Sequence, residues 1–175
     1  MAAGTKESSR LEERFRLWDS DGDGVIERSD FETEADDIIT GLGAQGTPKG
    51  AELRQVYLAM FDRLSRAAGT PQMDKGQFIQ AANQEIISKG DAGFASVVGP
   101  TIQAIVNVLD SDGDGEVSQT EMTKWFEAIG LEPDVADQAF RELDTDGTGR
   151  LSVTELIDAV RDYHLGKNDI PLLGR

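Results

Sequence analysis

Three short stretches of the chain carry oxygen-bearing side chains at alternating positions, a spacing that suits a metal site. They begin at Asp19, Asp110 and Asp144, and each opens with Asp-x-Asp-Gly-[Asp/Thr]-Gly. Alternation points successive side chains inward where the chain curls round an ion, and a hard divalent cation takes several oxygen ligands at once. These stretches therefore predict three sites for a cation such as calcium.

The EF-hand, a helix-loop-helix calcium motif, explains which atoms are used. Its 12-residue loop takes ligands from positions 1, 3, 5, 7, 9 and 12, and position 7 contributes its backbone carbonyl. The candidate ligands are Asp19, Asp21, Asp23, Val25 (carbonyl), Glu27 and Asp30 in the first loop; Asp110, Asp112, Asp114, Glu116 (carbonyl), Ser118 and Glu121 in the second; and Asp144, Asp146, Thr148, Arg150 (carbonyl), Ser152 and Glu155 in the third. Serine at position 9 is expected to act through water.

The three loops differ in their expected metal preference. The Asp110 loop has the preferred residue type at every demanding position, whereas Thr148 removes one charge from the Asp144 loop. In the Asp19 loop, Asp30 stands at position 12, and Asp is one methylene shorter than Glu and gives one oxygen more often than two. This favours six-coordination, so the sequence predicts calcium in all three loops and magnesium competition in the Asp19–Asp30 loop.

Two further loop positions indicate how the loops are built. Position 6 needs unusual backbone angles, and glycine occupies it in each loop, as Gly24, Gly115 and Gly149. Position 8 is apolar and is expected to pair with the neighbouring loop in a short strand. We therefore expect Val117 to face Leu151, and Ile26 to face Met73.

Apolar residues recur at helical spacing on both sides of each loop, which predicts helix, loop, helix in every unit. The entering stripes include Leu11, Phe15 and Trp18; Ile102, Ile105, Val106 and Leu109; and Ala136, Ala139, Phe140 and Leu143. Tyr57, Met60, Phe61 and Leu64, with Phe78, Ala81, Ala82 and Ile86, flank a fourth segment, 65–77, that has almost no carboxylates. The predicted fold is all-α: four EF-hand units in two pairs within a compact globule, the second unit degenerate.

The predicted organisation is an N-terminal pair over residues 1–88, a linker over 89–100 and a C-terminal pair with a tail over 101–175. Pro48 and Pro133 are expected to open helices, because proline suits the first helical turn. The tail is expected to leave the helical state at Gly166. Its Leu172 and Leu173 are candidates to cover an apolar groove.

Composition excludes several functions. The net charge of −16 argues against nucleic acid and against an anionic membrane surface. The absence of cysteine excludes disulfides and thiolate metal sites, and a single histidine excludes an imidazole-rich one. We expect no secretory signal, because the first residues are polar, and no membrane span, because no apolar run approaches about 18 residues. A cytoplasmic location is therefore expected.

With these motifs, the chain resembles the four-EF-hand sarcoplasmic calcium-binding proteins and their bacterial relatives of the calerythrin type. The resemblance rests on the three DxDG[DT]G loops and on a second unit without ligands, and it covers about the whole chain. It implies two EF-hand pairs packed into a compact globule that takes three calcium ions. Members of this family are usually regarded as calcium buffers, and some bacterial members are suspected signalling proteins. Asp30 departs from the pattern.

A calcium buffer, acting as a monomer without a protein target, is the favoured function. The main alternative is a calcium sensor that regulates a partner protein by exposing an apolar groove. Sensor grooves are Met-rich, and besides Met1 the chain has only Met60, Met73 and Met122.

A remote alternative is a photoprotein-like small-molecule binder, because calcium photoproteins and luciferin-binding proteins share the four-unit plan. An enzyme is not expected, since one histidine and no cysteine suggest no nucleophile–base pair. We interpret His164 as a surface or packing residue.

Overall fold

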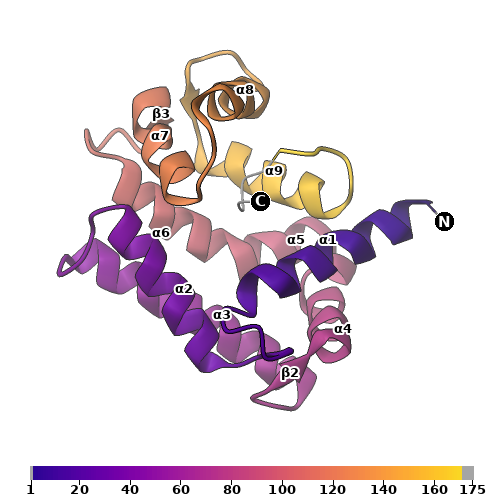
Figure 1. The fold of residues 1–175 in the computed structure, drawn as a ribbon. Helices are drawn as coiled ribbons and strands as arrows, with labels where there is room; N and C mark the ends of the chain where they lie inside the picture. Colours follow the sequence, from indigo (N-terminus) through magenta and orange to yellow (C-terminus); the bar gives the residue numbers. More distant parts are fainter. Residues whose placement is uncertain (1, 171–175) are drawn as a thin grey trace.

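Helices follow one another along almost the whole chain in the computed structural model, which describes residues 2–170 and the side chains of residues 9–170 (Figure 1). The elements are α1 (Ala2–Trp18), β1 (Val25–Ile26), α2 (Arg28–Gly41), α3 (Pro48–Ala68), β2 (Met73–Asp74), α4 (Lys75–Glu85), the 3-10 turn η1 (Ile87–Lys89), α5 (Gly90–Gly93), the π-helical η2 (Phe94–Val98), α6 (Gly99–Leu109), β3 (Val117–Ser118), α7 (Gln119–Ala128), α8 (Pro133–Leu143), β4 (Arg150–Leu151) and α9 (Val153–His164). The fold is all-α, with four EF-hand units in two pairs.

Short antiparallel strands join the loops of each pair. β1 pairs with β2, with Ile26 opposite Met73, and β3 pairs with β4, with Val117 opposite Leu151. All four side chains are fully buried. Both predicted pairings are thus confirmed, and they fix the two loops of a pair back to back.

The start of each exiting helix is set by a capping box, in which the cap and the third helical residue exchange hydrogen bonds. The paired residues are Glu27 with Asp30, Asp74 with Gln77, Ser118 with Glu121, and Ser152 with Glu155. In the three acidic loops these residues are positions 9 and 12, so the candidate ligands also fix where the helix begins. Pro48 and Pro133 occupy the first turns of α3 and α8, as predicted.

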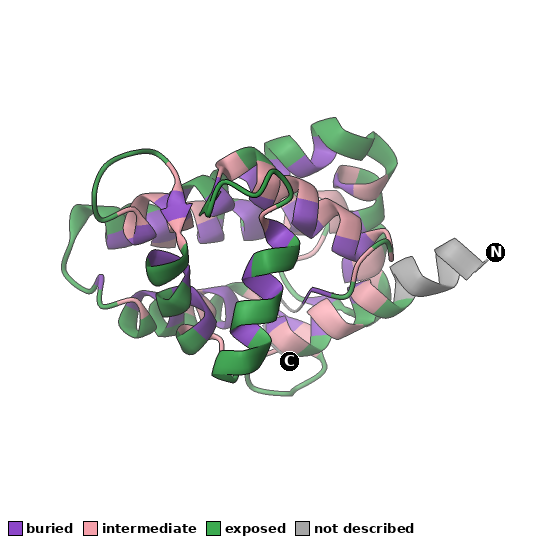
Figure 2. Cartoon of the chain, turned by 90° about the horizontal axis from the view of Figure 1, so that it is seen from above, coloured by how far each residue is buried: buried purple, intermediate pink, exposed green. Residues whose placement is uncertain are grey.

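One continuous core joins the two pairs. Helix α3 packs against α2, α4 and α6, while α1 contacts α9 and α2 contacts α7, so helices from both halves lie side by side. Aromatic rings fill the centre of the first half: the Trp18 and Phe31 centroids are 4.7 Å apart, and those of Phe31 and Phe61 are 5.3 Å apart. Figure 2 shows buried residues on the inward faces of the helices and exposed residues outside. The globule is therefore compact.

The predicted linker over 89–100 consists of consecutive helical turns, η1, α5, η2 and the start of α6. Phe94 and Val97 are buried, so the segment contributes to the core. Gly93 permits a close approach, since a Cβ there would lie 2.3 Å from the Ile86 carbonyl oxygen. The division into residues 1–88 and 101–175 stays a prediction.

The helical stretch Lys75–Leu109 contains an 18-residue window with a mean hydropathy of 1.5. By length and composition alone this stretch suffices to cross a membrane. Half of the window is buried inside the protein. This burial is typical of a core helix, because the apolar side chains of the stretch would otherwise be in contact with water.

The second unit differs from the others in its loop. Helix α3 extends into the segment 65–77 and ends at Ala68. Gly69 caps it in a left-handed conformation, with φ of 73°. Few residues then remain before β2, which leaves no extended ligand loop. At the other end of the chain α9 ends at His164 and Ile170 is buried, while Leu172 and Leu173 lie outside the described residues.

Candidate metal sites

The backbone of each acidic loop holds its first carboxylate inward. The amide of the position-6 glycine donates to that carboxylate: Gly24 to Asp19 Oδ2 at 3.0 Å, Gly115 to Asp110 Oδ2 at 2.8 Å, and Gly149 to Asp144 Oδ2 at 2.8 Å. These glycines have φ of 90°, 80° and 80°, in the region where other residues are strained. The loops thus share one geometry, and the glycines make it accessible.

Position 5 adds a second set of bonds of the same kind. Its amide donates to the carboxylates at positions 1 and 3 in every loop, at 3.1–3.2 Å. The carboxylates therefore converge because the backbone donors converge. A cation at that point would meet oxygens already oriented toward it.

Position 12 closes each loop, and its carboxylate is held from both sides. Glu121 Oε1 accepts from the Ser118 amide at 2.9 Å, and Oε2 accepts from the Ser111 amide at 2.6 Å and hydroxyl at 2.9 Å. Asp30 accepts the equivalent bonds from Ser20 and Glu27. Both acids are buried, at 5% and 1% exposed.

A residue type missed by sequence reasoning takes part in this closure. The hydroxyl at position 2 donates to the position-12 carboxylate in all three loops, from Ser20, Ser111 and Thr145. The signal for it was present, because each loop has Ser or Thr directly after its first Asp. These hydroxyls position a ligand without being one.

Carboxylate oxygens gather in each of the three loops. Oxygens lie within 4.8 Å of one another in the groups Asp19, Asp21 and Asp30; Asp21, Asp23 and Glu27; Asp110, Asp112 and Glu121; and Asp144, Asp146 and Glu155. Positions 1, 3 and 12 thus converge every time. Oxygen-only donor sets of this kind fit a hard cation such as calcium.

The candidate ligands at positions 5, 7 and 9 are placed by hydrogen bonds, by strand positions and by an ion pair. The Ser118 and Ser152 hydroxyls accept from the amides of Glu121 and Glu155, so they cap α7 and α9. The Thr148 hydroxyl donates to the Arg150 carbonyl at 3.0 Å, which brings two candidate ligands of that loop together. The other candidates lie in their loops at the predicted positions: Val25 begins β1, Glu116 precedes β3, and Asp114 is in an ion pair.

The carboxylates of the Asp110 loop repel one another, and the pKa values of Asp112 and Glu121 are shifted. The pKa of Asp112 is raised, first by its hydrogen bond with Asp110 and further by burial and the charges of Glu121 and Asp110. For Glu121, burial opposes ionisation, but the hydrogen bonds from Ser118 and Ser111 outweigh it and hold the pKa below its ordinary value. A bound cation would relieve the repulsion between these groups.

The second unit has no such group among its described side chains. Its capping box uses Gln77, whose Oε1 accepts from the Asp74 amide at 2.9 Å, where the other loops have a carboxylate. A neutral amide replaces the charge at this position and keeps the helix start. The unit therefore retains its packing role and lacks a ligand set.

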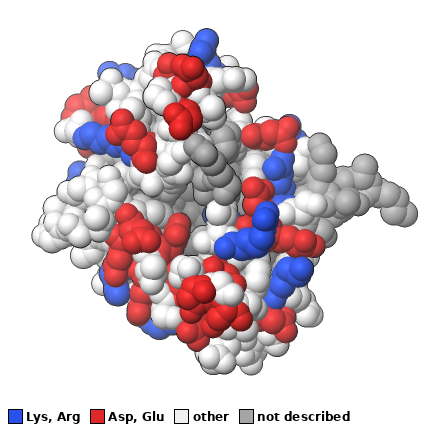
Figure 3. Space-filling model, in the orientation of Figure 1, with Lys and Arg blue, Asp and Glu red and all other residues white. Residues whose placement is uncertain are grey.

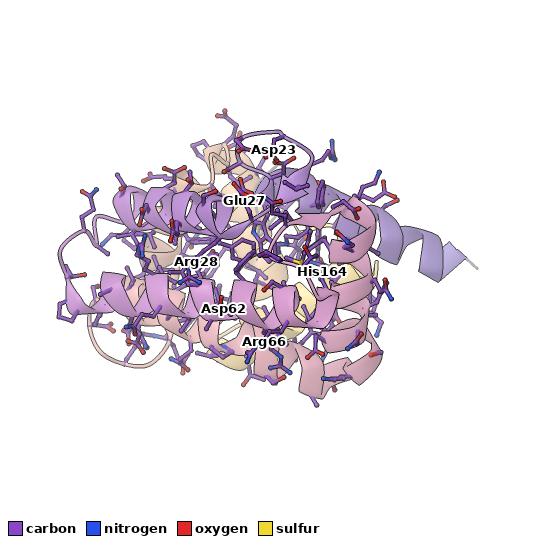
Figure 4. The ribbon with its side chains drawn as sticks, turned by 90° about the horizontal axis from the view of Figure 1, so that it is seen from below. Asp23, Glu27, Arg28, Asp62, Arg66 and His164 are labelled. Atoms are coloured by element: carbon purple, nitrogen blue, oxygen red, sulfur yellow. The ribbon has the colours of Figure 1, made fainter. Side chains whose placement is uncertain are left out.

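His164 is buried among the packed helices, and Figure 4 shows it apart from Asp23 at the edge of the view. Burial lowers its pKa to about 3, and its Nδ1 is 2.8 Å from the Val160 carbonyl oxygen. The imidazole therefore stays neutral near pH 7 and keeps its hydrogen bond to the backbone. This agrees with a packing role.

The surface is predominantly acidic. Figure 3 shows Asp and Glu side chains in several groups on one face, with Lys and Arg between them. Cross-helix ion pairs contribute to this pattern; one of them joins Arg28 on α2 to Asp62 on α3 at 2.9 Å (Figure 4).

Comparisons with known proteins agree with this geometry. A model described as an EF-hand domain pair matches residues 101–161, and one described as EF hand matches residues 11–33. Calerythrin from Saccharopolyspora erythraea is 37% identical over 171 residues, which cover 95% of this chain and 97% of that protein. The luciferin-binding protein of Renilla reniformis is 29% identical, covering 93% and 88%.

A solved structure of a Streptomyces coelicolor calcium-binding protein, described as acting in prokaryotic calcium-mediated regulation, superimposes with a TM-score of 0.75. It is 31% identical, and the match covers 91% of this chain and 98% of that one.

Proposed function

Because this chain belongs to the calerythrin family of EF-hand calcium-binding proteins, we propose that it binds three calcium ions and acts as a monomeric cytoplasmic calcium buffer without catalytic activity. The observation that supports this proposal most directly is the convergence of the carboxylates at positions 1, 3 and 12 in each of the three acidic loops. The proposed ligands are the side chains and carbonyls assigned above at positions 1, 3, 5, 7, 9 and 12.

Burial of the apolar stripes favours a buffer over a sensor. A sensor exposes an apolar groove when it binds calcium. Here Trp125, Phe126 and Phe140 are buried in the shared core. Among the described side chains, Val135 is the one large apolar residue that is exposed. Opening the molecule would expose large aromatic groups, which is unfavourable.

The binding of an environment-sensitive dye, measured with and without calcium, distinguishes the two functions. A buffer binds less dye, or the same amount, after calcium is added, because ordered loops tighten the core. A marked increase in dye fluorescence with calcium would instead support a sensor with a protein target, the role in regulation that is described for the Streptomyces coelicolor relative.

For the Asp19 loop we propose magnesium competition, since Asp30 is the shorter acid at position 12. The amides of Gly24, Gly115 and Gly149 report the three loops separately in an NMR spectrum, because each donates to a position-1 carboxylate. Magnesium titrated into the full chain is expected to shift Gly24 at lower concentration than the other two. Equal responses, or none at Gly24, would remove this part of the proposal.

A cavity of about 100 Å³ favours a second candidate function, the binding of a small molecule. It lies between the two halves, lined by apolar and aromatic groups together with the polar or charged side chains of Arg14, Thr101 and His164. The Thr101 hydroxyl is buried without a hydrogen-bond partner among the described residues. Buried polar groups are normally paired, so this hydroxyl is consistent with a ligand or water at the site.

Phenol and benzene test this candidate, since cavities of roughly this size accept a benzene ring. If the cavity binds ligands, phenol shifts the NMR signals of lining residues at lower concentration than benzene, and Thr101→Val removes that preference. Equal binding of the two molecules, or no shift with either, contradicts a ligand site that uses the hydroxyl.

A further inference from the structure

Arg150 lies where the two C-terminal loops meet. Its backbone belongs to β4 and stands opposite Ser118 of β3. Its side chain crosses to the other loop, where Nη1 forms an ion pair with Asp114 and lies 3.7 Å from Asp112 Oδ2. One arginine therefore contacts two of the candidate calcium ligands of the Asp110 loop.

The same residue also belongs to the Asp144 loop. Its carbonyl is the candidate position-7 ligand, and this oxygen accepts a hydrogen bond from the Thr148 hydroxyl. Because position 7 uses the backbone, the side chain is free to vary there. In this chain the residue at that position is Arg150, whose guanidinium lies at the carboxylates of the Asp110 loop.

In the N-terminal pair, the side chains that the structure describes include no cation in the equivalent place. Gln72, which precedes Met73 as Arg150 precedes Leu151, takes the corresponding place; its neutral amide donates to Glu27 Oε2 at 3.0 Å. Among the described side chains, no Lys or Arg forms an ion pair with Asp21 or Asp23. The contact is thus specific to the Asp110 loop, and the Asp19 loop serves as an internal reference.

We propose that the Arg150 side chain competes with calcium for Asp112 and Asp114, and thereby weakens calcium binding at the Asp110 loop. The proposal rests on the proposed calcium sites. A guanidinium held at these carboxylates repels a calcium ion at short range and offsets their negative charge, so each weakens the binding of the other. The loop with the most complete ligand set therefore does not reach the affinity that its ligands alone would allow.

Solvent limits the size of this effect. The side chains of Arg150, Asp112 and Asp114 are 45%, 53% and 30% exposed, so the pair is screened by water. Exposed ion pairs are weak, and their upper range corresponds to a change in affinity of about fivefold. The competition also shrinks as salt is added, because exposed charges are screened over about 10 Å at 0.1 M ionic strength.

The test compares the wild-type chain with R150Q and R150K, and with R141Q as a control that removes an arginine from α8. Calcium is titrated against a chelator, and the amides of Gly24, Gly115 and Gly149 report the three loops. In R150Q the Gly115 midpoint is expected to fall by up to about fivefold, while Gly24 does not move. R150K keeps the positive charge and should stay nearer to wild type, and R141Q should leave Gly115 unchanged.

An unchanged or raised Gly115 midpoint in R150Q overturns the competition. An equal shift at Gly24, or the same shift in R141Q, overturns it as well, because it shows a general effect of net charge. A wild-type Gly115 that does not respond to calcium is a different result, since it contradicts the calcium site itself.

Discussion

Asp30 is the position-12 acid of the first loop, where the other two loops have Glu. Its Oδ1 accepts from the Ser20 amide at 3.2 Å and hydroxyl at 2.9 Å, and its Oδ2 accepts from the Glu27 amide at 2.9 Å. Glu121 accepts the equivalent three bonds in its own loop. The surroundings are matched, so the substitution Asp30→Glu changes little except the reach of the carboxylate.

The expected gain follows from two opposing terms. We equate a second oxygen on the ion with a hydrogen bond to a charged group, which contributes about 1.5–3 kcal/mol. The added methylene enters a site where Asp30 is only 1% exposed, and overpacking costs about 1 kcal/mol or more. With overpacking at its lower figure the net gain is about 0.5–2 kcal/mol, which corresponds to a rise in calcium affinity of roughly two- to thirtyfold. Magnesium gains nothing, because it demands octahedral geometry with fewer protein ligands.

Calcium and magnesium titrations of the D30E variant, followed at Gly24, measure this change, with Gly115 and Gly149 as internal controls. The reverse variant, E121D, should lower the calcium-to-magnesium preference at Gly115. If D30E leaves the calcium-to-magnesium ratio at Gly24 unchanged, the length of the position-12 acid does not set the metal preference and the reasoning fails.

Two predictions concern stability. Since the pKa of His164 is about 3 in the folded chain and 6.5 ordinarily, the unfolded chain binds one more proton between these values and stability falls as pH falls. When the pH is lowered from 7 to 5, the wild type should lose about 2 kcal/mol more unfolding free energy than H164Q. Denaturant titrations in the presence of a metal chelator measure this difference. An identical loss in both proteins contradicts the buried neutral ring. Gly93→Ala should lower the melting temperature, because its Cβ would lie 2.3 Å from the Ile86 carbonyl oxygen, whereas Gly76→Ala, with 3.5 Å to its nearest neighbour, should not. Equal melting temperatures for the two variants would show that the helical segment relaxes around the added methyl group.

The sequence sufficed for the parts of the site that are local. Within one loop, positions 1, 3, 6 and 12 are close in sequence, so their spacing predicts which carboxylates converge. The strand pairings of Ile26 with Met73 and Val117 with Leu151 followed because EF-hand loops pair at a fixed position.

Other features depend on contacts that spacing does not reveal. The segment 89–100 has a Gly-rich composition typical of a linker, yet burial of Phe94 and Val97 stabilises it as helix. The reach of Arg150 into the neighbouring loop depends on the register of β3 against β4, which brings position 7 of one loop near the acids of the other. Tertiary packing determined both features.

Calcium stoichiometry tests the central claim most directly. Isothermal titration of the full chain, first stripped of metal with chelator, is expected to give three ions per chain, and each of D19N, D110N and D144N is expected to lose one. A wild-type stoichiometry other than three, or a variant that keeps all three ions, would contradict the assignment of one calcium ion to each acidic loop.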